Sequence, residues 1–179
     1  MANQRLTDKT ALEQQTGSGD LFMVVDVNDT TGSSAGTSKK LDSKFLIQTD
    51  KFSLDNAAIQ DLQPAGSPKT LVGALSGYMI TVFNVTILTT YASSTESSSN
   101  DLYLGYEANA SPSAYWFKYR DFMNSKTTDI TFMLNSDPPA GGTFATSILN
   151  KPFMMWSNAA FNGGWSCDVY VTYCYTKIL

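Results

Sequence analysis

The chain has 179 residues, which is enough for one domain with a substantial core, or for a small domain with an attachment segment. It contains no histidine, which excludes Ser-His-Asp and Cys-His catalytic sets, His-ligated zinc and imidazole pH switches. Only 16% of the residues are charged, the net charge is −4, and no basic run exceeds Lys39-Lys40, so we expect no nucleic-acid partner.

The sequence shows no sign of a signal peptide or a membrane-spanning helix. It begins Met1-Ala2-Asn3 without a basic stretch and an apolar run, and no segment approaches ~18 consecutive apolar residues. We therefore expect synthesis in the cytosol and no membrane partner. Cys167 and Cys174 lie seven positions apart in one expected strand, which puts them on opposite faces, so we interpret both as reduced packing thiols.

The composition changes near residue 63. Residues 1–62 carry nine acidic and six basic residues but three aromatics, whereas 19 of the 22 aromatics lie in residues 63–179. Between the two parts, residues 63–68 contain two prolines and a glycine, a composition typical of a linker or turn. We therefore predict a small mixed attachment segment over 1–62 and a β-sandwich module over 63–179.

The first part has four predicted elements. In chain order they are a short helix over 6–12, a buried strand over 21–27, a helix over 41–49 and a second helix over 54–62. Their apolar mass is too small to offset an ordering entropy of ~1–2 kcal/mol per residue. The segment is therefore expected to fold only against a partner surface.

The second part reads as short strands separated by turn clusters. Seven strand candidates fall at 78–91, 102–106, 115–119, 130–134, 144–149, 153–156 and 165–176. Asn84 marks a candidate bulge in the first of them. The spacing predicts an all-β fold, either an antiparallel sandwich or a jelly roll, and alternation alone does not choose between these topologies.

A search for reactive or ligand-binding residue sets finds no convincing one. The run from Asp26 to Gly32 invites comparison with a calcium loop, but its glycine falls one position late and no closing glutamate follows, so we interpret it as a turn. Gly17-Ser18-Gly19 likewise reads as a turn rather than a phosphate cradle. The acidic residues considered for glycoside hydrolysis lie beside turns or on an outward strand face: Asp101, Glu107, Asp121, Asp129, Asp137 and Asp168. We therefore predict no enzyme activity, no metal and no cofactor.

The tryptophans allow two interpretations. Trp116, Trp156 and Trp165 are either core and subunit-contact residues or exposed stacking platforms for a glycan. The low charge and the aromatic surplus favour self-association, because the centres of buried interfaces lose charge and gain aromatic residues.

Two stretches resemble virion structural proteins of tailed phages, including head-fibre, tail-fibre and decoration proteins. The first is Asp20-Leu21-Phe22-Met23-Val24-Val25-Asp26-Val27-Asn28-Asp29-Thr30-Thr31 with Ala35-Gly36-Thr37-Ser38-Lys39-Lys40-Leu41. It departs from the family pattern at Asn28 and Ser38. The second, less specific stretch covers residues 149–173, and residues 63–148 show no resemblance.

The resemblance implies a non-enzymatic virion protein, assembled in the host cytoplasm, of the capsid-decoration or short head-fibre type. A homotrimer is the commonest arrangement in that family, and the implied partners are the major capsid protein or other virion proteins. The alternative is a glycan-binding host-attachment module on a phage tail or capsid, with a host surface glycan as ligand. The candidate attachment residues are Leu21, Val24, Val25, Asp26, Asp29, Thr30, Thr31, Lys39, Lys40 and Phe45.

Two expectations depend on this division of the chain. Removing residues 1–62 is expected to leave a folded β domain. Val25→Asp is expected to disturb the leading segment more than Ser98→Asp, because a charge in a buried strand is costly whereas a solvated loop tolerates one.

Overall fold

The computed structural model describes residues 21–32, 34–63, 65–106, 108, 115–136 and 148–177. The chain divides into two compact units, Met1–Leu46 and Ile47–Leu179. The helix expected over 6–12 and the turn expected at 17–19 lie outside the described residues. The strand expected over 144–149 lies mostly outside them.

The described residues of the first unit contain a β-hairpin. Strands β1 (Leu21–Asp26) and β2 (Thr37–Asp42) are antiparallel, and the 3-10 helix η2 (Ser43–Phe45) follows β2. The helix expected over 41–49 is therefore wrong. Its first residues pair with β1, because an adjacent strand supplies backbone hydrogen bonds that a short isolated helix could not equal.

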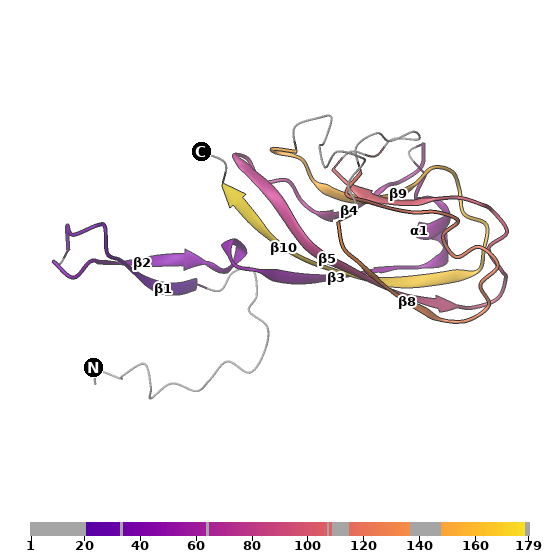
Figure 1. The fold of residues 1–179 in the computed structure, drawn as a ribbon, viewed down its shortest axis with the longest axis horizontal. Coiled ribbons are helices and arrows are strands. Elements are labelled where there is room, and N and C mark those ends of the chain that lie inside the picture. Colours follow the sequence, from indigo (N-terminus) through magenta and orange to yellow (C-terminus); the bar gives the residue numbers. More distant parts are fainter. Residues whose placement is uncertain are drawn as a thin grey trace. The chain divides into compact units, whose positions relative to one another are not determined.

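The described residues of the second unit form eight strands and one short helix. Figure 1 shows how these elements are arranged. Their bounds are β3 (Gln48–Leu54), α1 (Asn56–Gln60), β4 (Lys69–Val72), β5 (Tyr78–Tyr91), β6 (Leu102–Gly105), β7 (Phe117–Tyr119), β8 (Ile130–Leu134), β9 (Phe153–Ser157) and β10 (Trp165–Lys177). The strands predicted around 78–91, 102–106, 115–119, 130–134, 153–156 and 165–176 are confirmed. β3 and β4 were not predicted.

The eight strands form two antiparallel four-stranded sheets. The strand orders are β3-β10-β5-β8 and β4-β9-β6-β7. The pairs β3–β10, β4–β9, β5–β8 and β6–β7 nest inside one another along the chain, which is the connectivity of a long antiparallel hairpin rolled into a jelly roll. The all-β sandwich prediction is confirmed, and the strand order selects the jelly roll.

β10 shows why these residues form a two-layered fold. Trp165, Cys167, Val169, Val171 and Tyr173 alternate with partly exposed residues, so one face of the strand is apolar throughout. That face lines the core between the sheets, where buried side chains from both layers meet. Both cysteines are free, with Cys167 buried and Cys174 on the opposite face, as predicted.

The bulge expected near Asn84 is confirmed. The β5–β10 register shifts between Thr172, which pairs with Asn84, and Tyr173, which pairs with Val82. Phe83 is therefore the extra residue on β5 and is exposed.

The boundary between the units differs from the one expected at residue 62. β3 pairs with β10, and α1 directly follows it, so residues 47–62 belong to the sandwich unit. Leu54, Ile59 and Leu62 are buried in its core. Residues 65–68 lie inside this unit, where the Ser67 N–H donates to the Asp61 carbonyl at 2.7 Å.

A chain beginning at Ile47 should therefore keep the unfolding midpoint of the sandwich, whereas a chain beginning at residue 63 should fail to fold. The second truncation removes Leu54, Ile59 and Leu62, and loss of one such side chain typically costs ~2–5 kcal/mol. Urea unfolding followed by tryptophan fluorescence measures both. Cooperative unfolding of the shorter chain at the same midpoint would contradict this assignment.

Candidate functional site

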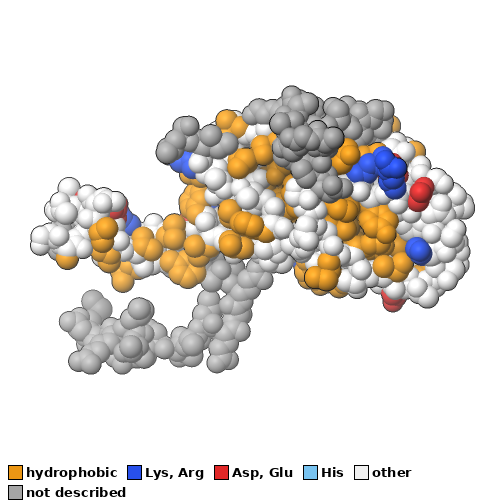
Figure 2. Space-filling model, viewed as in Figure 1, with side chains coloured by type: hydrophobic (Ala, Val, Ile, Leu, Met, Phe, Trp, Pro, Cys, Tyr) orange, Lys and Arg blue, Asp and Glu red, His pale blue; other side chains and the backbone are white. Residues whose placement is uncertain are grey.

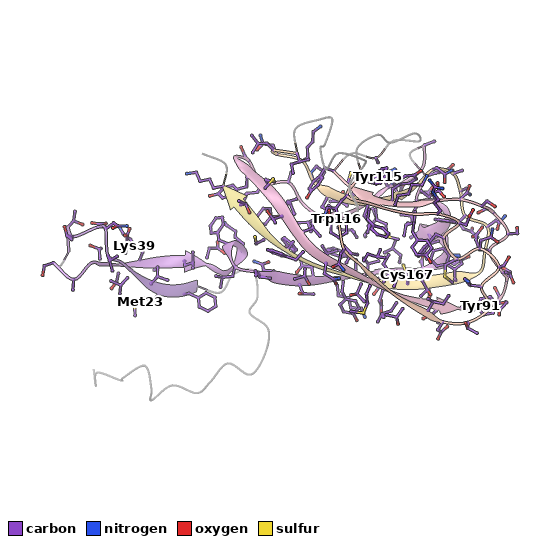
Figure 3. All side chains as sticks on the ribbon, viewed as in Figure 1. Met23, Lys39, Tyr91, Tyr115, Trp116 and Cys167 are labelled. Carbon is purple, nitrogen blue, oxygen red and sulfur yellow. The ribbon has the colours of Figure 1, made fainter. Side chains whose placement is uncertain are left out.

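The first candidate surface is strand β1 of the hairpin. Met23 is 75% exposed and Val25 is 58% exposed on one face, while Phe22 is 36% exposed and Val24 also lies open on the other. Figure 2 shows hydrophobic atoms along this hairpin, and Figure 3 shows Met23 projecting away from it. The expected strand exists, but it is not buried within the described part of the chain.

β2 covers these side chains only in part. Leu41 faces Phe22, but the residues opposite the other three are polar: Lys40 faces Met23, Lys39 faces Val24 and Ser38 faces Val25. Over Met23–Val25 the hairpin is therefore apolar on β1 and polar on β2. The β1–β2 sheet has two strands, so within the described residues no further strand pairs with the outer edge of β1.

The predicted polar residues of the hairpin form a cluster that closes its turn. The Asp29 carboxylate accepts from the Thr31 N–H at 3.0 Å and from the Thr31 hydroxyl at 2.6 Å, and it forms an ion pair with Lys39. The hydrogen bond from Lys39, followed by those from Thr31, lowers the pKa of Asp29 to about 2. These three residues bind one another, so their role is to fix the turn.

The turn interpretation of the run from Asp26 to Gly32 is confirmed. The Asp26 carboxylate accepts from the Asn28 N–H at 3.1 Å, an Asx turn. Gly36 completes the loop at a φ of 111°, where an added Cβ would lie 2.8 Å from the Asp26 carbonyl oxygen, so glycine is required there. Among the described residues, no group of three His, Cys, Asp or Glu side chains could hold a metal ion.

The remaining predicted attachment residues are not brought into one site. Thr30 is exposed at the loop, and Val24 and Val25 point to opposite faces of β1. Phe45 ends η2 and is half-buried, with the Lys44 ammonium 5.2 Å from its ring centroid. Leu21 begins β1, and its side chain lies outside the described part.

The three tryptophans are buried, which contradicts an exposed stacking platform. Trp116 packs edge-on against Phe153 with ring centroids 5.7 Å apart, and Trp165 packs against Phe122 at 5.4 Å. Figure 3 shows Trp116 on the sandwich unit. Trp156 is 0% exposed and stacks on Tyr103 at 5.6 Å. None of the three therefore offers a free ring face to a sugar.

Among the acidic residues considered for catalysis, Asp168 and Asp129 are engaged with local partners. Asp168 accepts from Ser53 at 2.6 Å and pairs with Lys51 at 2.9 Å, and Asp129 accepts from the Tyr91 N–H at 2.8 Å. The Asp101 carboxylate pairs with Lys118 and accepts from the Asp121 N–H at 3.2 Å, while the Asp121 side chain is exposed. Glu107 and Asp137 lie outside the described residues.

A cleft of about 280 Å³ opens beside β3 and β10. It is lined by Ser53, Leu54, Asp55, Thr90, Ser166, Cys167 and Asp168. The Asp55 carboxylate caps α1 through the Ala58 N–H at 2.8 Å, and burial raises the pKa of the Cys167 thiol to about 12. The cleft therefore brings together no activated nucleophile and base.

Glu96 is a buried carboxylate that sequence reasoning missed. It is 1% exposed and accepts hydrogen bonds from the Ser98 N–H at 3.0 Å, the Asn162 N–H at 3.0 Å and the Gly163 N–H at 2.8 Å. Burial by itself would raise its pKa, but hydrogen bonds from Ser98, Gly163 and Asn162 outweigh that effect and lower the pKa.

Glu96 joins two loops at one end of the jelly roll, residues 93–100 and residues 158–164. Two glycines allow the loops to approach closely. An added Cβ on Gly163 would lie 2.9 Å from the Glu96 backbone, and one on Gly164 would lie 2.2 Å from the Ser93 hydroxyl. A single glutamate in a serine-rich loop does not indicate this role. The adjacent glycines Gly163-Gly164 do indicate a place where another backbone can approach closely.

Comparison with known proteins does not assign the chain to a family. No protein-family model matches the chain, and a search of curated proteins finds no match. Among the described residues, no helix is long and apolar enough to cross a membrane.

We expect Glu96→Gln to lower stability by ~1.5–3 kcal/mol at neutral pH, because hydrogen bonds to a charged acceptor are replaced. The folded-state pKa of Glu96 is lowered, so its contribution is complete above the unfolded glutamate pKa of ~4.3 and is lost as the pH falls below it. Urea unfolding of both proteins from pH 7 to pH 3 should show the difference shrinking with acid. A difference independent of pH would contradict the assignment.

The expected order of Val25→Asp and Ser98→Asp is reversed by the structure. Val25 is exposed, so its replacement should change stability by less than ~0.5 kcal/mol. The Ser98 hydroxyl donates to Glu96, so Ser98→Asp places two carboxylates together and should cost ~1–3 kcal/mol. Thermal unfolding of the two variants at pH 7 tests this order, and equal midpoints would refute it.

Proposed function

We propose that this chain is a non-enzymatic structural virion protein of the capsid-decoration or short head-fibre type, attached to its particle by the hairpin. The observation that carries the proposal is strand β1, which has exposed apolar side chains on both faces. Exposed apolar surface of this kind is typical of a binding site for another protein.

The pattern on β1 indicates how the hairpin binds. A strand that is apolar on both faces is typical of a strand buried between two layers. Within the described residues no strand pairs with the outer edge of β1, so a strand of a partner can be added there. Such strand addition gives affinity through main-chain hydrogen bonds and specificity through alternate side chains. We therefore propose that a particle protein adds a strand beside β1 and covers Phe22 and Val24 on one face, and Met23 and Val25 on the other.

The sandwich unit supports self-association. Leu88 is 37% exposed and Met133 is 75% exposed on the outer face of the β5–β8 pair, and the bulge residue Phe83 of β5 is also exposed. This surface, the low charge of the chain and the resemblance described above support a trimer. Jelly rolls occur in viral capsid and lectin domains, which is an analogy of fold and not of function.

The glycan-binding alternative depended on exposed tryptophans. Since Trp116, Trp156 and Trp165 are all buried, it has no remaining support among the described residues, and we do not propose it.

We expect the full chain to bind empty particles of its phage, and Val25→Asp and Met23→Asp to weaken that binding at least tenfold without changing the unfolding midpoint. A charge brought into a dry interface without a partner costs several kcal/mol. Cosedimentation with particles measures binding, and Ser34→Asp, in the exposed loop of the same hairpin, is the matched control.

Two results would overturn parts of the proposal. Unchanged binding of the β1 variants would place attachment elsewhere on the chain. A monomer in sedimentation equilibrium at micromolar concentration would remove the trimer.

A further inference from the structure

The junction between residues 93–100 and 158–164 contains the one Asn-Gly pair of the sequence, Asn162-Gly163. Asn-Gly is the dipeptide in which an asparagine most readily closes to a succinimide. The following glycine has no Cβ to hinder attack by its own backbone nitrogen. Asn162 is exposed, so water reaches it.

Both reacting groups of this pair are held by the neighbouring loop. The Asn162 side-chain oxygen accepts from the Ser97 N–H at 3.0 Å, and its amide nitrogen donates to the Ser97 hydroxyl at 3.0 Å. The Gly163 N–H, which contains the attacking nitrogen, donates to the buried Glu96 carboxylate at 2.8 Å.

We propose that Asn162 is a latent deamidation site that Glu96 and Ser97 keep closed, and that it reacts only when residues 93–100 separate from residues 158–164. The proposal is independent of the attachment function. It assigns to Glu96 a protective role in addition to its contribution to stability.

The reaction needs only water. The Gly163 backbone nitrogen loses its proton and attacks Cγ of Asn162, the bond from Cγ to the side-chain nitrogen breaks, and ammonia leaves with that proton. Water then opens the succinimide at either carbonyl, which gives aspartate or isoaspartate. No oxidant, reductant or cofactor takes part.

The hydrogen bonds oppose this reaction at two points. The Asn162 amide must leave both Ser97 contacts before Cγ can turn toward the Gly163 nitrogen. The Gly163 N–H must also leave Glu96, whose lowered pKa makes its carboxylate a weak base toward a backbone amide.

Reaction would also prevent the junction from closing again. The product carries a new carboxylate at residue 162, whose backbone N–H binds Glu96 in the intact protein. Two neighbouring carboxylates repel each other. Opening of the two loops would therefore become irreversible once Asn162 has reacted. The fraction of chains deamidated at residue 162 would then rise with the frequency of opening.

The test is peptide mapping by mass spectrometry of the full chain after incubation at pH 8.5 and 37 °C, with the same chain in urea as reference. We expect Asn162 to deamidate at least tenfold more slowly in the folded chain than in urea. Glu96→Gln should raise the folded-state rate about tenfold, the factor expected from losing one hydrogen bond to a charged acceptor. Ser97→Ala should raise it by a smaller factor.

Two controls separate protection of this site from general stability. Asn135-Ser136, exposed at the end of β8, serves as an internal clock whose rate should not respond to Glu96→Gln. Ile87→Ala removes a core side chain away from the junction and should leave the Asn162 rate near that of the parent protein.

Equal Asn162 rates in the folded chain and in urea would overturn the proposal. An unchanged rate in Glu96→Gln would also overturn it. If Glu96→Gln does not fold, as judged by circular dichroism, Ser97→Ala decides the question, and a parental rate in that variant counts against the proposal.

Discussion

The jelly roll depends on the burial of one face of β10. This strand pairs with β3 on one side and β5 on the other, and its apolar face meets side chains of the second sheet. Because β3 is an edge strand held by β10 and is followed directly by α1, residues 47–62 fold with the sandwich although their composition resembles that of the leading segment. Hydrophobic burial across sheets therefore sets the boundary between the units.

A second constraint lies at the loops, where a buried charge adds to the apolar packing of Phe161 on Trp165. Glu96 satisfies backbone donors from both loops, and a buried donor without a partner would cost ~1–3 kcal/mol. In our proposal, the hydrogen bonds that stabilise the junction also keep the Gly163 nitrogen from attacking Cγ of Asn162. The hydrogen bonds to Glu96 therefore account for both the stability of the junction and the proposed slow deamidation of Asn162.

In the hairpin, the polar groups are paired but several apolar side chains are exposed. Its polar residues satisfy one another through Asp29, Thr31 and Lys39, whereas Met23 and Val25 of β1 lie opposite polar residues of β2 and are more than half exposed. An isolated two-stranded ribbon is only marginally stable in water. A partner that covers both faces of β1 would supply the missing burial, which is why we connect this strand with attachment.

Alternation and composition were enough to predict the all-β class, six of the eight described sandwich strands, the facing of the two cysteines and the small apolar content of the leading segment. The sequence also located the turn at Asp26–Gly32, since Asx chemistry is local. Four features became evident only in the folded protein: the jelly-roll order, the place of β3, the burial of the tryptophans and the role of Glu96. Each of these depends on contacts between residues far apart in the chain, and alternation carries no information about which distant strand or loop will be the neighbour.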